Sequence, residues 1–406
     1  MKLLHLVNLN STNIGNGALI YGLERVLNED FQGKLEFKRL AWDDYTFCFK
    51  SFDEKFVELI NSYDGLIVGA AVSFNGRAYL KNTGFRFNLP LDLWEKIKKP
   101  IVFYGISNMV WPHQRYYNLG QLKKTMNYIL NNPNIIFSVR KDGTKEWLEK
   151  LVGFKSDKIF TVPDTGVYVP TKDHDHPEIV EGKKNIIISL NGEDEEYRFG
   201  GRKREIFWQF FSKIMSEATI RNIWKKIPGW DSSKHKALKR LALAIEKISQ
   251  DGKINVILAP HYFDDYKMIS EMIPYFSSSF PHRNIISAGM LRVDKTEYFY
   301  NLYAKADLAL SMRIHSMSPS IGIGTPMIAL TTQTRMTAFM ENAGLSDFAL
   351  DMFDPKLTDK LCDLINYCLN NKDEVADKFS SSIGKMREKT REFNKRIESF
   401  LNERII

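Results

Sequence analysis

The sequence predicts an α/β protein built from two doubly wound, Rossmann-like domains. Short apolar runs alternate along the chain with segments of helical periodicity, a pattern typical of parallel strands buried on both faces. The length of 406 residues exceeds that of one ordinary domain. A polar, proline-containing segment at residues 170–184 divides the apolar runs into two series. We therefore place a domain boundary near residue 180.

The first domain is predicted over residues 1–180. It opens with a strand at Leu3–Asn8, a loop rich in Asn and Gly, and a helix from Ala18 to about Leu27. This order is how a doubly wound domain begins. Further strands are predicted at Gly65–Val68, Ile101–Tyr104, Ile135–Val139 and Ile159–Val162.

The second domain is predicted over residues 181–370 and repeats the same alternation. Its strands are predicted at 186–190, Ile254–Ala259, Asn284–Ser287, Leu308–Ser311 and Met327–Leu330. Because these runs are short and apolar, we expect them to lie inside a parallel sheet covered by helices.

The highly charged tail at residues 371–406 is predicted to be helical. Its apolar residues fall on one stripe at helical spacing: Phe379, Ile383, Met386, Phe393, Ile397 and Leu401. We predict a C-terminal helix that packs back over the first domain. A peripheral helix or a contact between subunits is the alternative interpretation.

The composition excludes several classes of protein. Hydrophobic residues make up 44% of the chain and charged residues 26%, which is typical of a globular protein and not of a disordered one. The three cysteines form no CxxC pair, so we predict neither a disulfide framework nor a metal site. The opening residues do not resemble a secretory signal, and no apolar run approaches the ~20 residues of a membrane-spanning helix. We expect a cytoplasmic protein.

Arg313 and His315 are the leading candidates for chemistry. They follow the apolar run Leu308–Leu310, and a turn, a short helix and another strand come next, so both residues lie at the carboxyl end of a strand. Ligands bind at that edge of an open α/β sheet. A guanidinium group matches a carboxylate or phosphate, and an imidazole exchanges protons near neutral pH. Alternatively, Arg313 pairs with a structural carboxylate and His315 caps the next helix.

The loop containing Asn13, Gly15 and Asn16 precedes the first helix of the chain. Its backbone N–H groups and the positive helix terminus could receive an anion or a sugar hydroxyl. The loop is neither a GxGxxG motif nor a P-loop with its lysine, which argues against a nucleotide. An Asn-Gly turn that simply reverses the chain is the alternative.

Three further charged residues also follow predicted strands. Arg140 and Asp164 lie at strand ends of the first domain, where pairing with each other is the alternative to ligand binding. Arg335 follows the run Met327–Leu330 and provides a second cation near Arg313.

Basic and aromatic side chains are concentrated at residues 198–240. The net charge of +8 favours anionic partners, but charge alone does not select among phosphorylated metabolites, acidic glycans, anionic lipids and nucleic acids. The basic and aromatic combination suits anionic lipid interfaces or acidic glycans. A peripheral contact with the inner face of a membrane is therefore one interpretation of the segment, and a helical pair packed on the second domain is the other.

The order of these motifs resembles the polysaccharide pyruvyl transferase family. An Asn-x-Gly-Asn-x-Ala loop, a Ser-Val-Arg strand end, a late Asp, an Arg-x-His pair and a Gly-x-Pro turn follow one another, and an Arg-x-x-x-Phe segment and a Gly-Leu pair complete the series. The matching residues are Asn13, Gly15, Asn16, Ala18, Ser138, Val139, Arg140, Asp164, Arg313, His315, Gly324, Pro326, Arg335, Phe339, Gly344 and Leu345. The resemblance runs from the first strand to about residue 350.

The resemblance implies a GT-B-like architecture and transfer of the enolpyruvyl unit of phosphoenolpyruvate to two sugar hydroxyls as a cyclic ketal. Phosphoenolpyruvate is then a co-substrate, no cofactor is needed, and the acceptor is a sugar of a surface or capsular polysaccharide precursor, whether free or lipid-linked. On this view the second domain binds the donor through Asn191, Arg313, Ile314, His315 and Arg335, and the first domain binds the acceptor through Asn13, Gly15, Asn16, Arg140 and Asp164. Arg313 would hold the phosphate or carboxylate, Arg335 would assist, and His315 would supply or remove a proton.

The chain departs from the family pattern at several positions. Asn191 stands where the family commonly has an Arg, so Arg198 or Arg202 would bind the anion of the donor in its place. Arg335 stands where the family commonly has a Lys. A nucleotide-sugar glycosyltransferase of the GT-B type is the rival enzyme. A noncatalytic glycan- or lipid-binding protein is the third possibility, and no nucleic-acid partner is expected.

Overall fold

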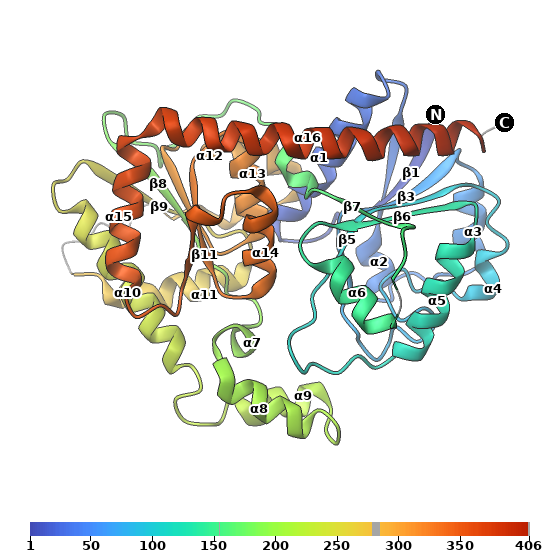
Figure 1. Cartoon of the computed structure of the whole chain (residues 1–406), viewed down its shortest axis with the longest axis horizontal. Coiled ribbons are helices and arrows are strands. Elements are labelled where there is room, and N and C mark those ends of the chain that lie inside the picture. The colour runs from blue at the N-terminus through green and yellow to red at the C-terminus, as the bar shows by residue number, and fades with distance from the viewer. Residues whose placement is uncertain (154, 278–284, 405–406) are drawn as a thin grey trace.

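The computed structural model describes residues 1–153, 155–277 and 285–404. Two parallel β-sheets lie side by side, each flanked by helices, and one long C-terminal helix crosses both (Figure 1). The predicted pair of doubly wound α/β units is confirmed. The predicted boundary near residue 180 falls in the connection between the two sheets, and the division at 180 and 370 stays a prediction.

The first sheet has seven strands in the order β2-β1-β3-β5-β6-β7, with β4 paired to β5. Its strands are β1 (Lys2–Val7), β2 (Glu36–Ala41), β3 (Gly65–Gly69), β4 (Val72–Phe74), β5 (Ile101–Asn108), β6 (Ile135–Arg140) and β7 (Ile159–Val162). The intervening helices are α1 (Ile14–Asp30), α2 (Trp42–Thr46), α3 (Glu54–Asn61), α4 (Leu91–Trp94), α5 (Leu119–Asn131) and α6 (Thr144–Val152), followed by the 3-10 helix η1 (Thr165–Tyr168).

Both faces of this sheet are buried, because side chains alternate between them along each strand. Leu4 and Phe103 face a core that α3, α5 and α6 cover. Leu3 and Val102, their neighbours in sequence, face a second core that α1 covers. Burial on both sides explains why these strands are continuously apolar.

The second sheet has five strands in the order β12-β11-β10-β8-β9. Its strands are β8 (Lys184–Ser189), β9 (Ile254–Leu258), β10 (Leu308–Ser311), β11 (Met327–Thr331) and β12 (Ala349–Asp351). Its helices are α7 (Glu195–Phe199), α8 (Gly201–Phe211), α9 (Glu217–Trp224), α10 (Ser232–Ser249), α11 (Phe263–Met272), α12 (Thr296–Ala304), α13 (Ile314–Ile323), α14 (Thr334–Ala343) and α15 (Leu357–Asn370). Short 3-10 helices lie at Ile273–Tyr275, Ala288–Met290, Val293–Lys295 and Ser346–Phe348.

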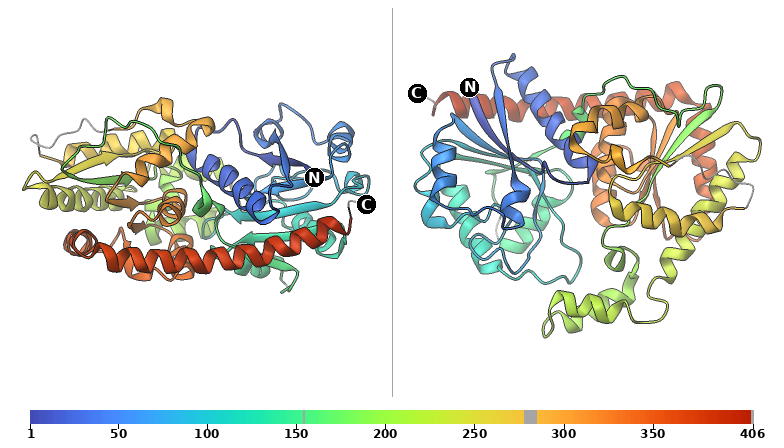
Figure 2. Two further views of the ribbon diagram at one scale, coloured as in Figure 1. Left: turned by 90° about the horizontal axis from the view of Figure 1, so that it is seen from above. Right: turned by 180° about the vertical axis from the view of Figure 1, so that it is seen from behind.

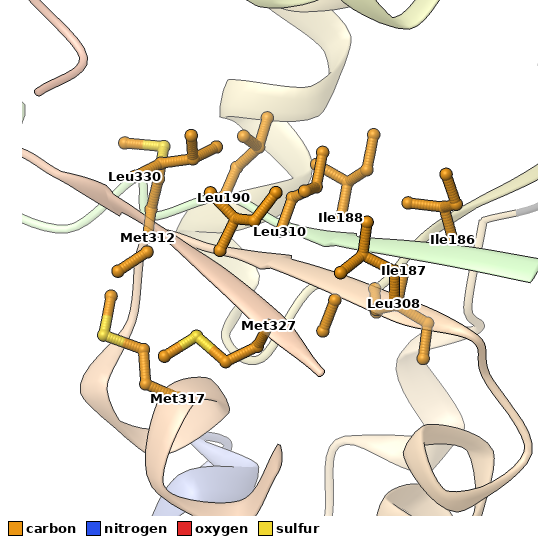
Figure 3. Packing of buried hydrophobic residues seen from close by; sticks show 14 of the residues in the cluster. Ile186, Ile187, Ile188, Leu190, Leu308, Leu310, Met312, Met317, Met327 and Leu330 are labelled. Carbon is orange, nitrogen blue, oxygen red and sulfur yellow. The ribbon is translucent and has the colours of Figure 1, made fainter. Parts of the chain in front are cut away.

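The centre of the second sheet is packed with aliphatic and methionine side chains (Figure 3). Ile186–Ile188 of β8 pair in register with Leu308–Leu310 of β10, and Met312 and Met317 are buried where β10 leads into α13. This core fixes the end of β10, and with it the positions of Arg313 and His315.

The C-terminal helix α16 (Lys372–Asn402) packs back on the first sheet as predicted (Figures 1 and 2). Phe393 meets the ring of Tyr104 edge-on at 5.4 Å, and Tyr104 donates a hydrogen bond of 2.9 Å to Asn394. Arg387 forms an ion pair of 2.6 Å with Asp30 at the end of α1. Because α16 follows the second domain in sequence and packs against the first, it connects the two domains.

Some expected elements differ from the structure. The region predicted as a strand at Asn284–Ser287 contains only an isolated bridge between Ile285 and Leu258, and Asn284 lies outside the described residues. The strands β2, β4 and β12 were not predicted from sequence. β4 and β12 have three residues each, and β2 alternates polar and half-buried residues at the edge of the sheet, so none shows a continuous apolar run.

Candidate active site

The carboxyl ends of the two sheets face a shared cavity of about 430 Å³. One wall comes from the first domain, at the end of β5 and the start of α6. The other comes from α7, α8 and the N-terminus of α14 in the second domain. The lining residues that matter below are Trp111, Asp142, Trp147, Arg198, Arg204 and Arg335. A volume of this size is in the range of ordinary small-molecule sites.

Arg335, a predicted donor-binding residue, lines this cavity at the start of α14. Its Nη1 donates a hydrogen bond to the carbonyl of Asn108 in the other domain, and its Nε lies 3.4 Å from the carboxylate of Asp142. Asp142 is itself held by Ser107 at 2.8 Å and by Thr144 at 2.5 Å. Burial lowers the pKa of Arg335, which still remains charged.

Arg198 and Arg204 supply two more guanidinium groups to the cavity. Arg198 donates to Thr332 at 2.7 Å and lies over the ring of Trp111, 5.4 Å from its centroid. The Arg204 guanidinium lies 5.2 Å from the ring centroid of Tyr197 and 5.5 Å from that of Trp208, and it donates to the carbonyl of Pro112 at 3.2 Å. Burial lowers the pKa of each arginine to about 10. These groups are charged at neutral pH and incompletely neutralised, as an anion site requires.

His315, Arg140 and Asp164 come together at the domain interface. Arg140 Nη1 lies 3.0 Å from Asp164 Oδ2, so the mutual pairing weighed for these residues is present. The Nδ1 atom of His315 lies 3.8 Å from the same Asp164 oxygen, and 13% of the His315 side chain is exposed. The pKa of His315 is lowered well below 6.5. Burial is the largest cause, and the positive charges of Arg140, Arg335 and Arg313 add to it. His315 is therefore neutral at physiological pH.

The loop before α1 touches the histidine from the first domain. Asn13 caps α1 by accepting the N–H of Gly15 at 3.0 Å, which is the chain-reversal role considered for this loop, and Asn16 donates its backbone N–H to the Asn13 carbonyl at 3.0 Å. A Cβ on Gly15 would lie only 2.4 Å from the Cβ of His315. Gly15 is thus required for the close approach that fixes the imidazole.

Arg313 is not among the residues that line the cavity. Both edges of its guanidinium are occupied, because Asp265 accepts bonds of 2.8 and 2.5 Å and Glu193 accepts one of 2.5 Å. This is the pairing with structural carboxylates that the sequence left open. Asn191 holds the same loop by accepting the N–H of Glu193 at 3.0 Å, and Ile314 is buried in the hydrophobic core.

Among the buried polar atoms that form no hydrogen bond within the described residues are Arg198 Nη2 and Arg204 Nε, on two arginines that line the cavity. Arg140 Nη1, Asp164 Oδ2, His315 Nδ1 and Arg335 Nε also form no hydrogen bond, but each lies within 4 Å of an oppositely charged or ionisable partner. Buried polar groups are normally satisfied, and exceptions often mark the place of a ligand or ion. The unsatisfied donors of Arg198 and Arg204 make this cavity the candidate site for an anion.

Several residues of the site were not singled out by sequence reasoning. Arg204, Asp142 and Trp111 line the cavity but were not among the predicted site residues, although Asp142 follows the predicted strand Ile135–Val139 closely. Arg198 had been named as a substitute anion contact and does line the cavity, whereas the Arg202 side chain lies outside the described residues. Arg204 was visible only as one of many basic residues at 198–240.

The two sheets and the shared cavity define a two-domain α/β protein of the GT-B type. A protein from Listeria monocytogenes assigned as a UDP-N-acetylglucosamine 2-epimerase superposes with a TM-score of 0.50 at 14% identity, over 94% of this chain and 90% of that one. The Anabaena protein HepE, solved with UDP and glucose, gives 0.49 at 12% identity over 99% of both chains. The ADP-heptose heptosyltransferase II of E. coli gives 0.47 at 13% identity, over 92% of this chain and all of the other.

The sequence model of the polysaccharide pyruvyl transferase family matches residues 13–334. This span is well over half of the chain and includes the Asn13 loop, Arg140, Asp164 and His315. The chain therefore belongs to the polysaccharide pyruvyl transferase family. Among curated proteins, none is similar to this chain at a significant level.

Two further observations bear on cofactors and location. In the part of the chain that the structure describes, no three His, Cys, Asp or Glu side chains are grouped to hold a metal ion. Over the same residues, none of the helices combines the length and the apolar character needed to cross a membrane.

Proposed function

We propose that the chain transfers the enolpyruvyl unit of phosphoenolpyruvate to two hydroxyls of a sugar in a surface or capsular polysaccharide precursor. Membership of the pyruvyl transferase family supports the reaction class. The observation that carries the proposal is the interdomain cavity lined by Arg198, Arg204 and Arg335. His315 does not line the cavity, but the charge of Arg335 helps to keep it neutral. The cytoplasmic location is part of the proposal and fits three free cysteines.

The cavity matches the charge of phosphoenolpyruvate. The donor presents a carboxylate and a phosphate, and each pairs well with a guanidinium group that is already fixed in place. In the proposal Arg335 and Arg198 bind these two groups, and Arg204 extends the positive wall. Arg313 acts as a positioning residue, because it holds Glu193, whose carbonyl accepts a bond of 3.3 Å from Arg198.

The neutral imidazole of His315 is suited to move a proton. In the first step the oxygen of a sugar hydroxyl bonds to C2 of the donor, and His315 takes the proton of that hydroxyl. His315 then delivers a proton to C3, which becomes a methyl group. The C2–O bond to phosphate then breaks. The second hydroxyl bonds to C2 and its proton leaves with the phosphate. The products are one ketal and one inorganic phosphate, and His315 returns to its neutral state.

The acceptor is proposed to enter from the side of the first domain. Arg140 and Asp164 lie next to His315 there, and Asp164 also accepts a bond of 2.7 Å from Ser318 of the second domain. The ring of Trp147 in the cavity wall offers an apolar face to a sugar. This placement brings the hydroxyls of the sugar to His315.

Thermal-shift measurements test the donor. Phosphoenolpyruvate is expected to raise the Tm by a few degrees at saturating concentration, because a ligand at 100 times its Kd adds about 2.7 kcal/mol of stability. Arg335→Ala should abolish the shift, and Arg292→Ala, an exposed arginine paired with Asp294, should keep it. Stabilisation by UDP or ADP but not by phosphoenolpyruvate would instead support the nucleotide-sugar glycosyltransferase. Sugar binding that survives loss of both Arg313 and His315, without donor binding, would support the noncatalytic alternative.

A further inference from the structure

The α8–α9 hairpin projects from the body of the protein, on the side opposite α16 (Figure 1; Figure 2, right). Its inner face packs Trp208, Ile220 and Trp224 against Trp111 of the first domain and Tyr197 of α7. This packing leaves other large apolar side chains of the hairpin uncovered. The hairpin therefore exposes more hydrophobic surface than its own folding requires.

The uncovered side chains share one face of α8 and the turn that follows it. Ile206, Phe210 and Ile214 are spaced four residues apart and are 47%, 69% and 74% exposed. Ile223 of α9 is exposed as well. Contiguous exposed apolar side chains on a folded protein mark a surface that binds a membrane or another protein.

The charge of the hairpin identifies the partner. Residues 200–230 contain seven Lys and Arg but only two Glu. Lys203, Lys213 and Lys226 are exposed and form no ion pair within the described residues. Apolar side chains flanked by unpaired lysines suit an anionic bilayer, where the side chains enter the interface and the ammonium groups meet the headgroups. A second copy of this chain would bring two like-charged hairpins together, which is unfavourable.

We propose that the α8–α9 hairpin docks the protein on an anionic membrane surface. Because Arg204 and Gly201 at the start of α8 line the cavity, docking places the cavity beside the headgroups. A sugar attached to a lipid of that membrane could then enter the cavity while its lipid carrier stays in the bilayer. The lipid-linked acceptor rests on the proposed function, whereas docking does not. A vesicle-binding experiment can therefore contradict docking without contradicting the transfer reaction, and the reverse also holds.

Vesicle co-sedimentation of the full chain tests the docking. We expect binding to vesicles of equal parts phosphatidylcholine and phosphatidylglycerol, weaker binding at high salt, and none to phosphatidylcholine alone. Phe210→Ser with Ile214→Ser should lower the partition coefficient roughly tenfold or more. Phe47→Ser with Phe49→Ser is the matched control, since these rings are 66% and 81% exposed on the other domain, and it should bind like the wild type.

The same variants show what overturns the proposal. A wild-type protein that does not sediment with the anionic vesicles contradicts it, and so does an equal loss in the Phe47 and Phe49 control. A wild-type dimer in sedimentation velocity that Phe210→Ser with Ile214→Ser converts to a monomer would assign the surface to a second copy instead. An unchanged melting curve of the Phe210 and Ile214 variant shows that lost binding is not lost folding.

Discussion

Replacing Arg335 by Ala is expected to lower kcat/KM for phosphoenolpyruvate by roughly 10²–10³, the usual cost of removing one fixed donor from a site that stabilises developing charge. Arg335 lines the cavity, and its positive charge also helps to lower the pKa of His315. Steady-state kinetics with varied donor concentration measures the loss. The fold should survive, because Asp142 keeps its bonds from Ser107 and Thr144 when Arg335 is removed.

Two other variants make the Arg335 result specific. Arg335→Lys retains the charge but not the planar fork, so it should recover part of the activity. Arg292→Ala removes an exposed arginine and should leave the kinetics unchanged. Donor kinetics that do not respond to Arg335→Ala would exclude this residue from donor binding.

Replacing His315 by Ala is expected to lower kcat by roughly 10²–10⁴, the range for loss of a general acid–base group. Because its pKa lies well below 6.5, the wild-type rate should stay flat as pH falls to about 6.5 and decline only at lower pH, as the imidazole gains a proton. Arg335 contributes to that lowering, so the residual activity of Arg335→Ala should decline at a higher pH than that of the wild type. Rate measurements across pH test both statements.

Gly15→Ala offers a second test of His315 that leaves the imidazole in place. The added methyl group would lie 2.4 Å from the His315 Cβ, so the ring must move and kcat should fall. Gly120→Ala is the matched control, because nothing lies within 4 Å of the added Cβ on that helix. Near-normal turnover in His315→Ala would remove the residue from proton transfer, and equal effects of the two glycine variants would assign the Gly15 result to stability alone.

The sequence predicted the buried part of the fold well because burial on both faces leaves a continuous apolar run. The strand Leu308–Ser311 was predicted with the bounds that the structure has, and so was Ile159–Val162. The edge strand Glu36–Ala41 was missed, since all of its side chains are exposed or half-buried and it has no continuous apolar run. Short edge strands are set by pairing with a neighbour and not by their own composition.

Which of the candidate residues bind substrate stays a prediction. Strand ends placed Arg140 and Asp164 at one edge of the first sheet and His315 and Arg335 at one edge of the second, because parallel strands end at one edge. The sequence could not show that Asp265, 48 positions before Arg313, occupies its guanidinium. Nor could it show that Arg204 lies against the rings of Tyr197 and Trp208, since that contact exists only once α7 and α8 have packed.

Incubation of the purified protein with phosphoenolpyruvate and candidate sugars, free and lipid-linked, decides whether the cavity performs the proposed transfer. Mass spectrometry should show an acceptor heavier by one pyruvate ketal, with one phosphate released for each ketal formed, and Arg335→Ala should form both products roughly 10²–10³ times more slowly. Consumption of a nucleotide sugar instead, with the acceptor gaining a whole sugar unit and phosphoenolpyruvate left intact, would contradict the proposal.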